Sequence, residues 1–137
     1  MPSRLNPYLH FKDNARAAME FYQSVFGGEL SLQTFGDFGA SSGPSDANLI
    51  MHSQLEAPNG FTLMASDTPA HMIYEDKRGY DISLSGDDEA GLTDNWNKLS
   101  DGATITMPLA KAQWGDSFGM LVDKFGTSWL VNISAAK

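Results

Sequence analysis

The chain of 137 residues contains no cysteine, which excludes disulfide bonds, thiol nucleophiles and thiolate metal sites. Long hydrophobic runs are also missing, because none approaches the about 18 residues that a membrane-spanning helix needs. The N-terminal sequence, MPSRLNPYLHF, lacks the apolar core of a signal peptide. We therefore expect a cytoplasmic protein with no membrane partner.

Basic residues are scarce, with nine Lys and Arg against seventeen Asp and Glu, which leaves a net charge of −8. The basic residues are scattered, whereas neutralisation of a phosphate backbone needs them clustered, so a nucleic-acid partner is not expected. The simpler explanation of the acidity is solubility. The more specific explanation is that the negative charge attracts a cationic ligand. The apolar content of 42% can fill the core of one domain, or of two small modules that share a core.

The most informative feature that is present is an internal repeat. Residues 14–28 and 88–102 share the layout of a short helix with an aromatic residue near its end and a glycine stop. The turns before the last strand of each half also match. Corresponding positions are Tyr22 and Trp96, Val25 and Leu99, and Gly28 and Gly102, all 74 apart, and Gly60 and Gly126, and Met64 and Leu130, both 66 apart. Two similar halves predict a pseudo-two-fold protein with its site between them.

Apolar periodicity predicts the order βαβββ in both halves, and hence an α+β fold of two pseudo-symmetric modules, residues 5–67 and 79–134. The expected strands are 5–11, 29–35, 49–56 and 61–66, then 80–85, 103–107, 118–123 and 128–134. Asp13 or Asn14 is expected to cap the first helix, and residues 67–78 to connect the halves. Each helix must cover one face of its sheet, which leaves the other face for a cavity or a partner.

With this layout, the sequence resembles the vicinal oxygen chelate superfamily, which has the glyoxalase, bleomycin-resistance and dioxygenase fold. More narrowly, it resembles the PhnB-like branch of that superfamily. The most specific pattern is WGxxFGMLxDxFGxxW, from Trp114 to Trp129. The resemblance is carried by segments 8–30, 51–55, 63–67, 81–88 and 107–133. It implies paired βαβββ modules that form a cup-shaped mixed sheet, usually completed in a homodimer. The superfamily covers several chemistries, so its fold does not settle the function.

The resemblance also implies four inward positions that hold a divalent metal in most catalytic members. They fall on Asn6, Met64, Asp81 and Leu130. A thioether and an isobutyl group cannot hold such an ion, and the other two residues are too few. The usual metal site is therefore expected to be lost, and no cofactor is expected. His10, His52 and Asp81 would make a displaced site if they converge, which is an alternative that we do not favour.

The inward face is instead expected to form a ligand pocket of mixed apolar and polar character. Trp96 and Trp129 are assigned to the core, and a core or dimer contact is the alternative role for the other aromatic residues. The loop of residues 36–46 is a candidate lid. The expected pocket residues are Tyr8, His10, Phe35, His52, Met64, Asp81, Trp114, Phe118 and Leu130.

Three functions fit this sequence. The first is a metal-free protein that binds an aromatic or cationic small molecule, as antibiotic-sequestration members of the superfamily do. The second is a lyase, isomerase or dioxygenase-like enzyme, with a non-standard metal or with His52 or Asp81 as an acid/base group. The third is a scaffold or partner-binding module. A methyltransferase role finds no support, because no glycine-rich cofactor loop is recognised.

The loss of the usual metal ligands predicts that the purified protein carries no stoichiometric metal. Elemental analysis should find less than one divalent ion per chain, and a thermal-shift scan over divalent ions should show no stabilisation at low concentration. Stoichiometric metal or a clear shift would instead favour the enzyme.

Overall fold

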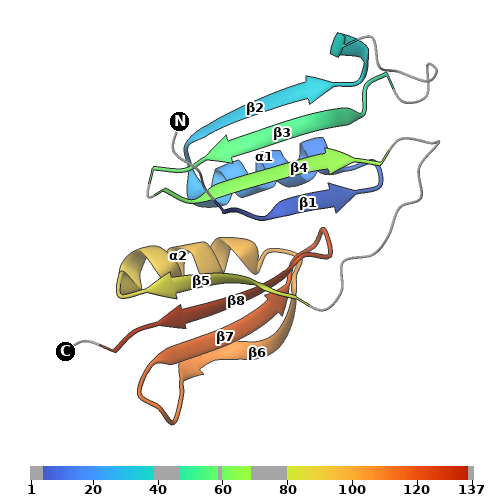
Figure 1. Cartoon of the computed structure of the whole chain (residues 1–137). Coiled ribbons are helices and arrows are strands. Elements are labelled where there is room, and N and C mark those ends of the chain that lie inside the picture. The colour runs from blue at the N-terminus through green and yellow to red at the C-terminus, as the bar shows by residue number, and fades with distance from the viewer. Residues whose placement is uncertain (1–4, 39–46, 59, 69–79, 136–137) are drawn as a thin grey trace. The chain divides into compact units, whose positions relative to one another are not determined.

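The computed structural model describes residues 5–38, 47–58, 60–68 and 80–135 (Figure 1). The chain divides into two compact units, Met1–Asp76 and Lys77–Lys137, and each is described by itself. The described residues of each unit form a four-stranded mixed sheet and one long helix. The predicted α+β class and the βαβββ order of both halves are therefore confirmed.

The first unit has its helix on one face of a sheet with strand order β1-β4-β3-β2 (Figure 1). Strand β1 pairs with β4 in parallel, and the other pairs are antiparallel. The largest fully buried side chains of this unit include Leu9, Phe11, Met19, Tyr22 and Leu55. The elements are β1 (Tyr8–Phe11), α1 (Ala15–Phe26), β2 (Glu29–Thr34), the 3₁₀ helix η1 (Gly36–Phe38), β3 (Ile50–Glu56) and β4 (Thr62–Asp67).

The second unit repeats this plan, with strand order β5-β8-β7-β6 and a parallel pair between β5 and β8. Trp96 on the helix and Trp129 on the sheet are both buried, as their assignment to the core requires. The elements are β5 (Ile82–Gly86), α2 (Glu89–Leu99), β6 (Thr104–Lys111), β7 (Ser117–Val122) and β8 (Ser128–Ile133).

The internal repeat extends to the hydrogen bonds of the turn before the last strand of each unit. In the second unit the N–H of Asp123 donates to the carbonyl of Thr127, and the N–H of Gly126 donates to the carbonyl of Asp123, both at 2.9 Å. The first unit makes the same two bonds 66 positions earlier, at 2.9 and 3.2 Å. Gly60 and Gly126 have φ of 84° and 86°, a region that favours glycine. The two halves therefore share the backbone geometry of this turn.

The N-terminus of α1 is capped by a residue from the end of its sheet. Asp67 accepts hydrogen bonds from the N–H of Ala15 and from the N–H of Ile50, both at 2.8 Å. The predicted cap is wrong for Asn14, whose side chain makes no capping bond. Asp67 was expected to begin the connector, yet it is the last residue of β4 and only 4% exposed.

Burial raises the pKa of the Asp67 carboxyl above its usual 3.8, and the two backbone N–H donors offset only part of this effect. The folded chain therefore holds this proton at a pH where the unfolded chain has released it. The free energy of unfolding accordingly falls as pH rises from about 4 through the folded pKa.

The edge strand β6 runs farther than predicted. It was expected to end at Met107, before Pro108, but it continues to Lys111. Proline lacks an N–H donor and is tolerated in a strand at the edge of a sheet, where one side of the backbone has no ladder to complete. Among the described strands, β6 has only β7 as a neighbour, and its register shifts on both sides of Met107.

The segment between Trp114 and Trp129 contains residues with clear structural roles. Asp123 accepts a hydrogen bond from the indole Nε1 of Trp129 at 2.8 Å, besides two backbone bonds within its turn. Gly119 allows a close approach, because a Cβ there would lie 2.8 Å from the Trp96 ring and from the backbone of Leu109. Part of this distinctive pattern therefore serves the core of the second unit.

Replacement of Asp67 by alanine should lower the free energy of unfolding by about 2–4 kcal/mol, because two buried N–H groups lose their acceptor. Asp88→Ala is the matched control. Asp88 caps α2 locally at 3.1 Å from the N–H of Gly91, and this exposed cap should cost only about 1 kcal/mol. Urea unfolding of both variants measures the difference. Equal losses would contradict the role assigned to Asp67.

Candidate functional site

The face of the first sheet that α1 leaves uncovered begins with alternate residues of β1. Leu9 and Phe11 are buried, whereas Tyr8 and His10 between them are exposed. The strand register places Tyr8 opposite Met64 and Met64 opposite Gln54, so these three side chains share the uncovered face. Alternation within β1 therefore fixes which residues a ligand can reach.

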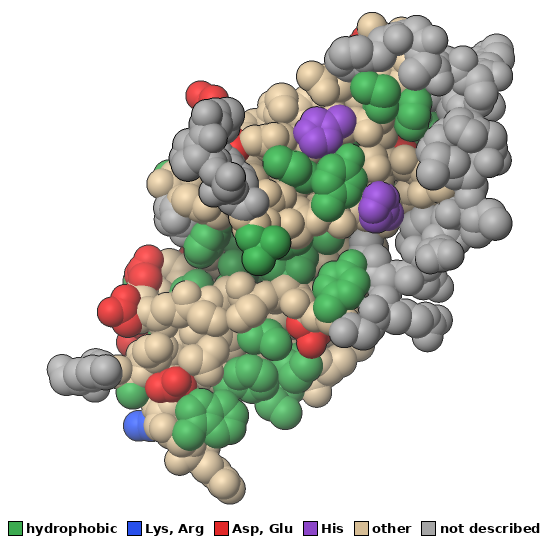
Figure 2. All heavy atoms as spheres, viewed as in Figure 1, with side chains coloured by type: hydrophobic (Ala, Val, Ile, Leu, Met, Phe, Trp, Pro, Cys, Tyr) green, Lys and Arg blue, Asp and Glu red, His purple; other side chains and the backbone are tan. Residues whose placement is uncertain are grey.

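Three rings gather on this face, and we call Tyr8, His10 and His52 the ring cluster. The Tyr8 ring centroid lies 5.2 Å from that of His10 and 5.8 Å from that of His52. The Tyr8 hydroxyl and His52 Nδ1 are 3.3 Å apart, which allows a hydrogen bond between β1 and β3. Figure 2 shows the two described histidines (purple) with hydrophobic side chains (green) beside them. The ring cluster combines planar surface with groups that donate or accept a proton.

Apart from Met64, the remainder of this face is polar. Gln33 lies opposite His52, and Ser66 lies opposite His10. Farther along β3, the carboxylate of Glu56 accepts hydrogen bonds from the Gln54 amide and, at 3.3 Å, from the Thr62 hydroxyl. The face thus changes from rings at one end to a hydrogen-bonded carboxylate at the other.

The uncovered face of the second sheet is more apolar. The register places Leu130 opposite Met120, and Met120 opposite Met107. Phe118 lies two residues before Met120 on β7, so the two share this face. Met107 is 46% exposed. Thioether, isobutyl and phenyl groups offer an adaptable surface for a flat apolar molecule.

Trp114 extends this apolar face at the turn between β6 and β7. Its ring meets Phe118 edge-on, with 5.8 Å between centroids and an interplanar angle of 64°. The following residue, Gly115, has φ of 99° and turns the chain back toward β7. Trp114 is 64% exposed, an unusual state for so large an apolar side chain.

The structure thus separates the predicted pocket residues into two groups. Tyr8, His10, His52 and Met64 share the face of the first sheet, and Trp114, Phe118 and Leu130 share the face of the second. Alternation along β7 could have added Met120. Met107 lay within the strand expected at 103–107 but was not assigned to the pocket.

The other predicted positions lie outside the strands. Asp81 is exposed just before β5, and Phe35 follows β2, where its N–H donates to the Leu49 carbonyl at 3.0 Å. Asn6 precedes β1, and its amide donates to the carbonyl of Pro7 at 3.1 Å. A meeting of Asp81 with the histidines, the alternative that we do not favour, would involve both units and stays untested. Most of the expected lid loop, residues 39–46, lies outside the described residues.

No group of three or more His, Asp or Glu side chains placed to hold a metal ion occurs within the described ranges. Met64 and Leu130, the corresponding positions of the two halves, both lie on uncovered sheet faces. Neither side chain is a ligand for a hard or borderline ion. The expected absence of a bound metal stays a prediction for elemental analysis.

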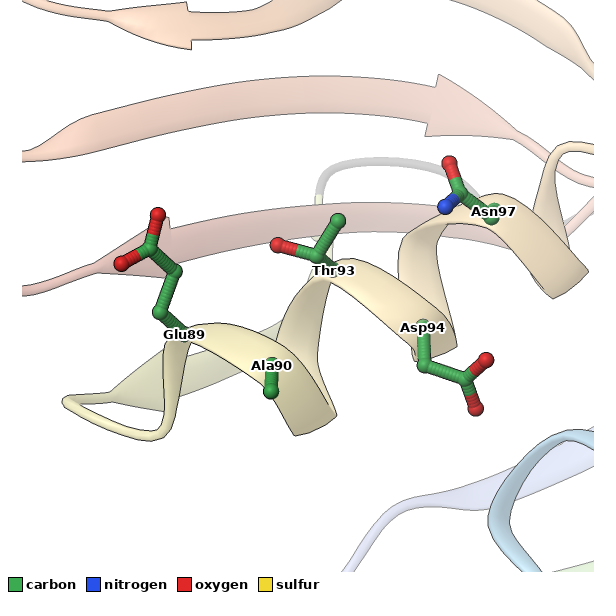
Figure 3. Close-up of a pocket in the computed structure, with 5 residues that line it drawn as sticks. All are labelled: Glu89, Ala90, Thr93, Asp94 and Asn97. Carbon is green, nitrogen blue, oxygen red and sulfur yellow. The ribbon is translucent and has the colours of Figure 1, made fainter.

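A shallow, solvent-open depression lies along the side of α2 turned away from its sheet (Figure 3). Asp94 on this surface pairs with Lys98 at 3.1 Å, one helical turn along. The depression contains none of the predicted pocket residues, and its side chains are those of an ordinary solvated helix. Its lining residues are Glu89, Ala90, Thr93, Asp94 and Asn97.

Comparison with known proteins identifies the family. The family described as 3-demethylubiquinone-9 3-methyltransferase matches residues 3–132 of the chain. The chain belongs to this family. It is 37% identical to protein PA1353 from Pseudomonas aeruginosa, with a TM-score of 0.84 over 98% of this chain and 100% of the other.

Two further solved structures share the fold of this chain. A putative 3-demethylubiquinone-9 3-methyltransferase, PhnB protein, from Bacillus cereus is 24% identical, with a TM-score of 0.76 over 96% of this chain and all of the other. A member of the glyoxalase/bleomycin resistance protein/dioxygenase superfamily from Sphaerobacter thermophilus is 17% identical, with a TM-score of 0.58 over 97% and 98%. The family match confirms the resemblance predicted from the sequence, and the two structures confirm the predicted fold.

Among the described residues of this PhnB-like protein, no helix has the length and apolar character needed to cross a membrane.

Trp114 should dominate the solvent-accessible fluorescence of this PhnB-like protein, because Trp96 and Trp129 are only 8% and 1% exposed. Trp114→Phe should remove most quenching by acrylamide and shift the emission to shorter wavelength. Trp96→Phe is the control and should retain the quenching. A quenching constant unchanged in Trp114→Phe would contradict the exposed position.

Proposed function

We propose that this PhnB-like protein binds a planar aromatic small molecule, preferentially a cation, on the uncovered sheet faces. Sequestration of a natural product such as an antibiotic is the specific form of this proposal. No metal takes part in the proposed binding. The homodimer expected from the resemblance belongs to the same proposal.

One observation carries this proposal, namely the exposed rings on both uncovered faces. A sheet face that only meets water is normally polar. Here Tyr8 is 40% exposed and Trp114 is 64% exposed, and each has further rings within about 6 Å. Flat ligands gain stacking contacts on such surfaces without any reactive group.

Charge supports the preference for a cation. The net charge of −8 attracts cations over long range, and aromatic faces bind them through their quadrupole. On the first sheet, the Glu56 carboxylate supplies a local negative charge on the same face as the ring cluster.

A second candidate is an enzyme with a metal-free acid/base site. The specific observation in its favour is the contact between the Tyr8 hydroxyl and His52 Nδ1, because a paired phenol and imidazole can move a proton. This candidate requires that a bound ligand be converted, which chromatography of the ligand after incubation would detect. Binding alone predicts that the ligand is recovered unchanged.

Ethidium, a planar aromatic cation, should quench the fluorescence of Trp114. Trp114→Ala should weaken its binding by about tenfold, because stacking and cation–π contact are lost together. Ile105→Ala is the matched control. Ile105 on β6 is an exposed apolar side chain too, at 40%. Its pairing with the buried Leu121 places it on the helix side of the sheet. Equal binding by both variants, or no quenching of the wild type, would overturn the proposal.

A further inference from the structure

We infer that the ring cluster is a charge-selecting subsite, which accepts planar aromatic cations while both imidazoles are neutral and planar aromatic anions once they are protonated. The inference rests on the proposed function and adds the ligand class and the groups that select it. Histidine is the side chain whose charge ordinarily changes between pH 5 and 8. His10 and His52 flank a single tyrosine ring, so a ligand stacked on Tyr8 meets both.

The contact between Tyr8 and His52 allows this change of charge without a change of fold. When the imidazole is neutral with Nδ1 unprotonated, the phenol O–H donates to it across the 3.3 Å contact. When the imidazole is protonated, Nδ1–H donates to the phenol oxygen instead. The same pair of atoms stays hydrogen-bonded in both states, so protonation alters the charge of the subsite and keeps its shape.

Among the described residues, the neighbouring strands present no charged side chain beside the ring cluster. Strand β4 presents Met64 and Ser66 beside the cluster, and β2 presents Gln33, none of which carries charge. Two acids, Glu56 and Glu29, face each other at the far end of β3 and β2. His52 and Glu56 are four positions apart on β3, which is about 13 Å along a strand.

The charged groups that the structure describes on the other elements of this unit are directed elsewhere. Asp67 at the end of β4 is buried against the N-terminus of α1, where it bonds the N–H of Ala15. Asp37 in η1 bonds the N–H of Thr34 at the end of β2. Lys12 lies beyond the end of β1, and the exposed charges of α1, Arg16 and Glu20, belong to a helix on the opposite side of the sheet.

Coulomb's law sets the size of the expected effect. A ligand charge about 5–6 Å from one imidazolium changes binding by about threefold in a water-like dielectric, and by more where water is partly excluded. Two imidazoles together should therefore change affinity by about tenfold or more. Linkage gives the sign, because a cation that binds the neutral form releases protons and binds more weakly as pH falls.

Ethidium and 8-anilinonaphthalene-1-sulfonate test this on the full chain, because one keeps its positive charge and the other its negative charge between pH 5.5 and 7.5. From pH 7.5 to 5.5, the Kd of ethidium should rise by about tenfold or more, and the Kd of the sulfonate should fall. Both responses should disappear in the double variant His10→Gln, His52→Gln. Gln33→Ala, a neighbour of His52 without a titrating group, should keep both responses.

Circular dichroism at both pH values, on all three proteins, checks that the fold is unchanged. The inference would be overturned if both probes bind independently of pH, or if a pH response survives in the double variant. Either result would leave the proposed function standing. Absence of ethidium binding at either pH would instead overturn the proposed function, and the inference with it.

Discussion

One helix can cover only one face of a four-stranded sheet, and the candidate site depends on this constraint. In each unit the buried apolar side chains of the sheet lie on the face that the helix covers, and the opposite face is left to other contacts. Strand alternation then decides residue by residue what that face presents. On β1 it places Tyr8 and His10 outward because Leu9 and Phe11 are needed in the core. The core and the site are therefore set by the same alternation.

The two halves keep one backbone plan and differ in what they place on it. The turn hydrogen bonds repeat with an offset of 66 residues, and Met64 and Leu130 occupy corresponding places on the uncovered faces. Yet the first face combines imidazoles, a phenol and a carboxylate, whereas the second is dominated by thioethers and aromatic rings. A duplicated frame thus presents two different chemical surfaces.

The helix caps show the same divergence within a common plan. Asp88 caps α2 from the adjoining residue, as sequence rules expect. The cap of α1 comes from Asp67, 52 residues from Ala15 along the chain, and also binds the first N–H of β3. A buried carboxylate is costly unless it is hydrogen-bonded, and these two donors account for its place in the core. No local pattern around residue 14 reveals such a partner.

Periodicity and the internal repeat were sufficient to predict the α+β class, the βαβββ order of both halves and the burial of Trp96 and Trp129. These properties follow from local geometry, since alternation and helical spacing depend on near neighbours. The continuation of β6 past Pro108 was not predictable, because it depends on the position of that strand at the edge of a sheet. The cap at Asp67 and the contact between Tyr8 and His52, 44 residues apart, were also decided by strand pairing. The sequence alone determined which residues face away from the core, and only the tertiary structure decided which of them meet, because meeting depends on register between distant strands.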